Sequence, residues 1–343
     1  MNYNPITALA IFFGISFLLF LIFRPKKGIY FLAKKLYQQK DKIIIEDILK
    51  YLYHNQTSNN SVTTNNLTNA LNFSNTLIIE NLKKMIKNKL IIFVKDTYRL
   101  TMKGNKYALQ IIRAHRLWEK YLSEKTGFNK LEWHERAEKK EHELSASEIN
   151  KLSNLLRNPK FDPHGDPIPT SKGKIVNKKG IVLSSLKKNT VGKIIHIEDE
   201  PDIIYKKILA ENIHLHSTIR VIENNSNQIV FYSEGEQFTL APIVAGNITI
   251  SILEKNEIEE ENITRLSSLL LGESAKIVGL SKECRGENRR RLLDLGFVKG
   301  TSIEIDLLNP LGDPKAYLIK GTAIALRENQ ASKILIKKIN DGK

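Results

Sequence analysis

The sequence predicts a multi-domain α+β chain, with helices in its first half and two small SH3-like β-barrels in its second. Three observations predict this class. With 343 residues, the chain can bury several separate cores. Apolar residues recur at helical spacing up to residue 157, whereas β-branched residues and Gly turns dominate after the proline-rich loop at 158–170. Two copies of one strand and helix pattern then occupy 186–252 and 273–340.

Charge and cysteine content restrict the partners and ligands. Lys and Arg number 53 and Asp and Glu 37, a formal net charge of +16, which favours anionic partners such as nucleic acid or the inner face of a membrane. Cys284 is the only cysteine, so no intramolecular disulfide can form and a reducing, cytoplasmic location is expected for most of the chain. A metal site must therefore use His and carboxylate ligands.

The first element is predicted to be a transmembrane helix at 1–24. Its uncharged run, 5–23, has about the 20 residues that a bilayer-spanning helix needs. Basic residues follow this run and begin a basic linker at 25–40, which by the positive-inside rule puts the rest of the chain in the cytoplasm. We expect a single-pass protein of the inner or cell membrane, held there through 5–23.

A winged helix-turn-helix is predicted at 41–110. Helical spacing in "IIIEDILKYLYH" is followed by two short helical patterns, "NNLTNALN" and "SNTLIIENLKKMIKNK", and then by two strand-like runs, "LIIFVKD" and "YRLTMKG". Ser74 is the expected N-cap of the third helix, and the polar pair Asp96 and Thr97 divides the strands. This order is typical of a winged helix-turn-helix, whose second motif helix would contact DNA.

The helical segment at 111–172 concentrates metal-ligating residue types. At helical spacing, the face of "WHERAEKKEHELS" carries two histidines and two glutamates, and the preceding helix carries a His and a Glu four residues apart. Two antiparallel helices joined near Gly127 would bring these groups together around one or two divalent cations. The six residues are His115, Glu119, His134, Glu138, Glu141 and His142.

This face has two other interpretations. A zinc peptidase needs two histidines four residues apart, but the residue four after His134 is Glu138, which excludes that enzyme. A helix hairpin with solvated charges remains the alternative to a metal site. No nucleophile with an adjacent base, phosphate loop or dinucleotide fingerprint occurs in the sequence, so we expect a protein that is not an enzyme.

Two quoted stretches carry a resemblance to a known family. "AHRLWEKYLSEKTGFNKLEWHERAEKKEHELS", followed by "LLRNPKFDPHGDPIPT", resembles the dimerisation and metal-binding domain of the diphtheria toxin repressor and manganese transport regulator family. The resemblance extends over roughly 42–250. It implies a dimeric repressor that a metal activates by joining the first winged-domain helix to the dimerisation helices.

The resemblance also implies a ligand set. One metal position would use His115, Glu119 and His134, and the other Glu138, Glu141 and His142. The first winged-domain helix would add Asp47, with Glu46 as the alternative and Ile44 where a second ligand would stand, and the barrel segment "EDEPD" would add Glu200. Such nitrogen and oxygen donors suit Mn²⁺ or Fe²⁺, although Zn²⁺ would bind more tightly if it were available.

The resemblance places DNA contacts on the helix that begins after Ser74. The expected contacts are Ser74, Asn75 and Thr76 at its start, and Lys83, Lys84 and Lys87 toward phosphates. Where the family has small polar residues, this sequence has Ile79 and Glu80, and a carboxylate repels phosphate. Two functions therefore stay open: a membrane-tethered, metal-dependent transcriptional regulator, or a metal-sensing subunit of a manganese, zinc or iron ABC transporter that no longer contacts DNA.

Two further resemblances concern the ends of the chain. "RRRLLDLGFVKGTSIEI", with the segment that follows it, resembles a FeoA domain, an interaction module associated with ferrous iron transport. The apolar N-terminal run that ends in "FRPKKGIYFLAKKL" resembles the last helix of a metal ABC permease. Cys284 lies in the first loop of the FeoA-like barrel, where we expect a structural thiol rather than a ligand.

Overall fold

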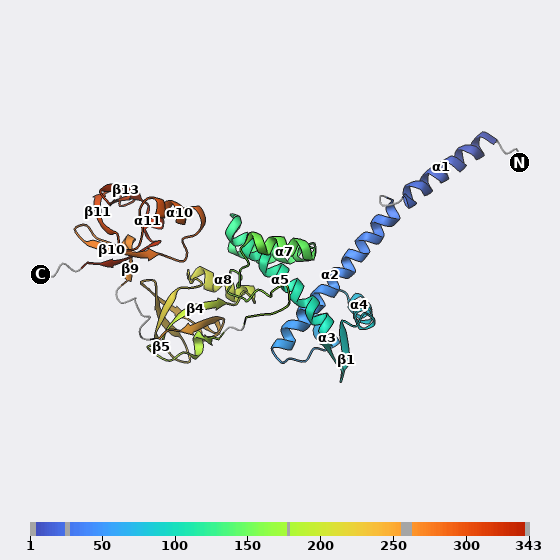
Figure 1. Cartoon of the computed structure of the whole chain (residues 1–343), viewed down its shortest axis with the longest axis horizontal. Coiled ribbons are helices and arrows are strands. Elements are labelled where there is room, and N and C mark those ends of the chain that lie inside the picture. Colours follow the sequence, from blue (N-terminus) through green and yellow to red (C-terminus); the bar gives the residue numbers. More distant parts are fainter. Residues whose placement is uncertain (1–4, 25–27, 177–178, 255–262, 340–343) are drawn as a thin grey trace. The chain divides into compact units, whose positions relative to one another are not determined.

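The computed structural model describes residues 5–24, 28–176, 179–254 and 263–339 (Figure 1). The chain forms two compact units. The N-terminal unit consists of Met1–Glu119, Glu132–Pro159 and Ile168–Ile175, and the C-terminal unit of Lys120–Leu131, Lys160–Pro167 and Val176–Lys343.

Two helices begin the N-terminal unit: α1 at Pro5–Phe23 and α2 at Ile29–Thr57. The predicted basic linker at 25–40 is thus helical from Ile29 onward. The reason is its composition, because Lys, Leu, Ala and Gln are strong helix formers and no Pro or Gly interrupts them.

The predicted membrane span is wrong. Within the described residues, no helix combines the length and the apolar character that crossing a membrane requires. Part of the predicted span was not assessed, because the side chains at 5–8 and 10 lie outside the described residues. The expectation of a single-pass location in the cell membrane fails with it.

The winged helix-turn-helix is built as the sequence predicts. After α2 come α3 at Thr64–Ala70, α4 at Asn75–Lys87, β1 at Ile91–Val94 and β2 at Thr97–Leu100. Ile44 and Ile48 of α2 pack with Ile78 and Leu82 of α4 in one buried cluster, so α2 fixes the position of α4.

The ends of these elements differ from the prediction in two details. Lys95 and Asp96 have positive φ and connect β1 to β2, whereas Thr97 belongs to β2 and pairs with Val94. Such a two-residue turn matches the twist of a hairpin. Ser74 is the N-cap residue of α4, but its side chain accepts no capping hydrogen bond.

Three helices follow: α5 at Met102–Lys125, α6 at Trp133–Glu141 and α7 at Ala146–Leu155. Helix α6 ends at Glu141, with His142 as its C-cap residue. Ser145 is the N-cap residue of α7 and forms a capping box with Glu148. The Ser145 hydroxyl accepts the backbone N–H of Glu148, and the Glu148 carboxylate accepts the backbone N–H of Ser145. The buried residues of α6 are Trp133, Ala137 and Glu141, which are spaced four residues apart and so lie on one stripe of the helix.

The C-terminal unit contains two six-stranded antiparallel sheets. The first has the order β3-β8-β4-β5-β6-β7, and the second has the corresponding order β9-β14-β10-β11-β12-β13. The first consists of β3 at Ile181–Val182, β4 at Val191–Ile197, α8 at Asp202–Ala210, β5 at Thr218–Asn224, β6 at Ile229–Ser233, β7 at Glu236–Leu240, α9 at Pro242–Ala245 and β8 at Ile248–Ile252.

The second consists of β9 at Ile263–Arg265, β10 at Ser274–Leu280, α10 at Gly286–Asp294, β11 at Ser302–Leu308, β12 at Lys315–Ile319, β13 at Thr322–Leu326, α11 at Glu328–Ala331 and β14 at Ile334–Lys338. The pairing of β4 with β8 shifts register between Ile194 and His196, and that of β10 with β14 between Ile277 and Gly279. Equal strand order and matching irregularities agree with the repeat seen in the sequence. Cys284 is buried in the second core, as expected for a structural thiol.

Candidate metal centre

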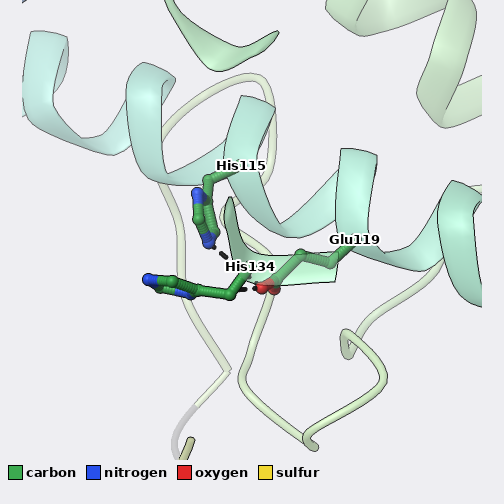
Figure 2. A group of neighbouring side chains, drawn as sticks. All are labelled: His115, Glu119 and His134. Atoms are coloured by element: carbon green, nitrogen blue, oxygen red, sulfur yellow. Dashed lines mark ion pairs between the residues drawn. The ribbon is translucent and has the colours of Figure 1, made fainter. Parts of the chain in front are cut away.

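Helices α5 and α6 bring three of the predicted ligands together. His115 and Glu119 lie one turn apart on α5, and His134 lies in the first turn of α6. His115 Nε2 is 3.2 Å from Glu119 Oε1, and His134 Nδ1 is 3.5 Å from the same oxygen (Figure 2). One donor atom from each residue lies within 4.8 Å of the others, a spacing that a single ion can bridge. We call His115, Glu119 and His134 the first group.

A second group joins α2 to the end of α6. Asp47, Glu141 and His142 each offer a donor atom within 4.8 Å of the other two. His142 Nε2 is 3.3 Å from Asp47 Oδ1 and 3.6 Å from Glu141 Oε1. The alternative residue, Glu46, contacts the other ring nitrogen, with Oε2 2.7 Å from His142 Nδ1. A carboxylate on the far nitrogen orients a ligating imidazole, so Glu46 suits a supporting role.

Glu141 connects the two groups. Its side chain is fully buried, and its Oε2 lies 2.5 Å from His115 Nδ1. Its Oε1 accepts a hydrogen bond from Lys50 Nζ at 2.8 Å. Sequence reasoning missed Lys50, although it follows Asp47 by three residues and Glu46 by four, the spacing that puts all three on one face of a helix.

Glu138 lies apart from the second group to which it was assigned. Its Oε1 is 3.5 Å from His134 Nε2, and this hydrogen bond lowers the pKa of Glu138 to about 2. Within the described residues, neither three-residue group includes it. Glu138 therefore faces the outer side of His134 rather than Glu141 and His142.

One histidine in each group, His115 and His142, is protonated at neutral pH because its pKa is raised. Burial alone would lower the pKa of His115, but Glu119 and Glu141 raise it to about 9. Burial likewise opposes protonation of His142, and its hydrogen bonds to Asp47 and Glu46 raise the pKa to about 9. A divalent ion would have to displace these protons, because ligation needs the neutral imidazole.

The donor chemistry fits a hard or borderline divalent ion. The two groups supply only imidazole nitrogens and carboxylate oxygens, and several of these are buried where an unpaired charge would be costly. Mn²⁺, Fe²⁺ and Zn²⁺ all accept such a donor set. The solvated helix hairpin does not describe this site, because Glu119 and Glu141 are among the most buried charged residues of the chain.

The predicted barrel ligand, Glu200, belongs to the C-terminal unit and is exposed. The neighbouring residue, Asp199, lies near a histidine: its Oδ2 is 3.8 Å from Nε2 of buried His164. His164 lies in the stretch "LLRNPKFDPHGDPIPT", and the predicted ligand set does not include it. A second pair of this kind, His196 and Asp166, has its nearest atoms 3.4 Å apart.

The predicted DNA-contacting residues lie on α4 and at its start. Ser74, Asn75 and Thr76 are exposed at the N-terminal end, and Lys83 and Lys87 are exposed farther along. Lys84 differs, because its ammonium forms an ion pair with Asp41 of α2 at 2.5 Å. Ile79 and Glu80 are also exposed, as expected for a surface that faces outward.

Sequence comparisons match two segments of the chain to known families. The iron dependent repressor, metal binding and dimerisation domain matches residues 101–170, and the FeoA domain matches 264–338. A probable metal transport system membrane protein of Chlamydia trachomatis is 41% identical over 85 residues, which are 25% of this chain and 19% of that protein. The iron-dependent repressor IdeR of Mycobacterium bovis is 32% identical over 100 residues, which are 29% of this chain and 44% of that protein.

The chain thus spans about a fifth of the length of the first relative and less than half of the second. Among solved structures, a manganese-dependent transcriptional repressor in complex with manganese has a TM-score of 0.56 at 27% identity, covering 61% of this chain and 99% of that one. These matches support the predicted divalent transition-metal cofactor. The predicted resemblance is confirmed: the chain carries a metal-binding and dimerisation domain of the iron-dependent repressor type, within a repressor-like fold, and a FeoA domain.

Proposed function

We propose that the protein is a metal-dependent transcriptional repressor that binds DNA as a dimer. The observation that carries the proposal is the set of contacts between α2 and the end of α6, where Asp47 and Glu46 meet His142. Because α2 packs on α4, any change in how α2 meets α6 moves the helix that would contact DNA. The repressor relatives and the dimerisation domain support this function.

The candidate ligands are the first group, His115, Glu119 and His134, and the second group, Asp47, Glu141 and His142, with Glu46 as a supporting residue. A bound divalent ion would supply positive charge between these carboxylates in place of the protons on His115 and His142. Glu141 accepts a hydrogen bond from His115 Nδ1–H and so leaves Nε2 directed at Glu119. A ligand that binds the DNA-competent arrangement more tightly shifts the population toward it.

The DNA surface would be α4 and the residue before it. Ser74, Asn75 and Thr76 would contact the target near the helix start, while Lys83 and Lys87 would meet phosphates. Exposed Ile79 would contact at most a thymine methyl group, and Glu80 would accept from cytosine N4. We therefore expect the protein to discriminate between few bases, with much of its affinity coming from phosphate contacts.

A mobility-shift experiment tests this function. The full chain should shift DNA from its own promoter when Mn²⁺ is present and should lose the shift when EDTA removes the metal. His134→Ala combined with His142→Ala should abolish the shift at any Mn²⁺ concentration that leaves the wild type bound. The matched control is Glu135→Ala on the same helix, because Glu135 is exposed and pairs only with Lys139 among the contacts described. An equal shift with and without EDTA would contradict metal dependence.

A second function is favoured by one specific observation, the similarity to a probable metal transport system membrane protein. In that case the chain would be a metal-sensing subunit of a transport system, and the winged domain would contact protein. Calorimetry would then detect Mn²⁺ binding while the mobility shift stayed negative. Neither function requires catalysis, and the absence of an enzymatic activity stays a prediction.

A further inference from the structure

Lys50 occupies an unusual position for a lysine. It lies on α2, its side chain is only 18% exposed, and its Nζ is 2.8 Å from Oε1 of the fully buried Glu141. No sequence pattern assigns it a role, and the metal-dependent function uses the residues around it. A buried ammonium is costly unless anionic groups surround it. Here Glu141 is the direct partner, and Asp47 and Glu138 add attraction.

The Lys50 ammonium contacts Glu141 Oε1, an oxygen that a metal ion in the second group would need as a ligand. Glu141 Oε1, which accepts the hydrogen bond from Lys50 Nζ, is the same atom that lies 3.6 Å from His142 Nε2. A transition metal binds carboxylate oxygen at about 2.0–2.2 Å. An ion there would lie within a few ångströms of the ammonium, and two cations at that separation repel strongly where little water screens them.

The other oxygen of Glu141 serves the first group. Oε2 lies at His115 Nδ1, and the opposite ring nitrogen, Nε2, faces Glu119. Lys50 therefore holds Glu141 ionised and oriented, and Glu141 in turn fixes the direction of the His115 ring. This arrangement leaves the first group open to an ion, while the second group already holds a positive charge.

We propose that Lys50 is a resident cation that replaces an ion in the second group, so that the chain binds one transition-metal ion, at His115, Glu119 and His134. This proposal rests on the metal-dependent function proposed above. Two consequences follow. The contacts from His115 through Glu141 to Lys50 connect an ion in the first group to α2, and Lys50 sets the number of ions bound.

The experiment compares full-length wild type with Lys50→Met and the charge-preserving Lys50→Arg. Mn²⁺ per chain is measured by calorimetry and by elemental analysis after dialysis, and the unfolding temperature is measured in EDTA. We expect about one ion per chain for wild type and Lys50→Arg and about two for Lys50→Met, because removing the ammonium frees Glu141 Oε1. The metal-free unfolding temperature should fall in Lys50→Met and recover on adding Mn²⁺.

Two results would overturn the proposal: about one ion bound by Lys50→Met, or about two bound by the wild type. Neither touches the proposed function, since the Mn²⁺-dependent DNA shift of the wild type would remain. A wild type that binds no Mn²⁺ contradicts the proposed function itself and overturns this inference with it. If Lys50→Met does not fold, Lys50→Gln, which keeps a donor toward Glu141 without the charge, gives the same comparison.

Discussion

At the scale of single residues, the candidate centre balances buried carboxylates with protonated histidines. His115 and His142 both have a pKa of about 9, because carboxylates outweigh the effect of burial. Glu141 belongs to the second group and also contacts His115 of the first, and its two oxygens have different partners. Without metal, the negative charge of these carboxylates is therefore balanced by the protonated side chains of His115, His142 and Lys50.

This charge balance predicts how the stability of the metal-free protein depends on pH. The folded pKa of His142 is raised above its unfolded value of about 6.5, so its contribution is fully present below pH 6.5 and is lost as pH rises to about 9. We expect the free energy of unfolding in EDTA to fall by roughly 1–3 kcal/mol between pH 6.5 and 9.5. Urea unfolding at these two pH values measures it. His142→Gln should flatten part of the dependence, and a wild type whose stability rises over this range would refute the assignment.

At the scale of elements, helix spacing predicted much of the centre. The i and i+4 spacing of His115 and Glu119 predicted that both face one way, because a helix fixes which residues share a face, and the family resemblance then grouped them with His134. The assignment of Glu138 and the role of Lys50 depend on how α2, α5 and α6 pack, and a periodic pattern carries no information about the rotation of one helix against another. The apolar composition of α1 likewise predicted a membrane span that the described residues do not support.

The junction of the wing with α5 allows a prediction at this scale. Gly104 lies in the first turn of α5, and a Cβ there would come within 2.0 Å of the backbone oxygen of Leu90. Gly104→Ala should therefore lower the free energy of unfolding by at least about 2 kcal/mol, although Ala is the better helix former by about 1 kcal/mol. Urea unfolding measures the change. Gly127→Ala is the control, since a Cβ at Gly127 meets nothing within 4 Å, and equal effects at the two positions would contradict the packing argument.

At the scale of the whole molecule, the internal repeat could be predicted from the sequence, whereas contacts between distant residues could not. The internal repeat is visible in the sequence because both copies must place β-branched residues and turns at equivalent points, and the two sheets share one strand order. The net charge of +16 pointed to an anionic partner without indicating which lysines are available. That information comes from contacts such as the Lys84–Asp41 ion pair, which join segments distant in sequence.

The last prediction concerns how this charge is used on DNA. Neutralising a phosphate releases counterions, so each lysine that contacts DNA adds about 0.9 to the slope of log affinity against log salt concentration. Lys87 is exposed, whereas Lys84 forms an ion pair with Asp41. Lys87→Ala should therefore reduce the slope by about 1 per protomer and Lys84→Ala by much less. Fluorescence anisotropy with promoter DNA between about 50 and 200 mM salt, at saturating Mn²⁺, measures both slopes. If Lys84→Ala reduces the slope as much as Lys87→Ala, then Lys84 leaves Asp41 to contact DNA, and the packing of α4 on α2 rests on the buried cluster of Ile44, Ile48, Ile78 and Leu82 alone.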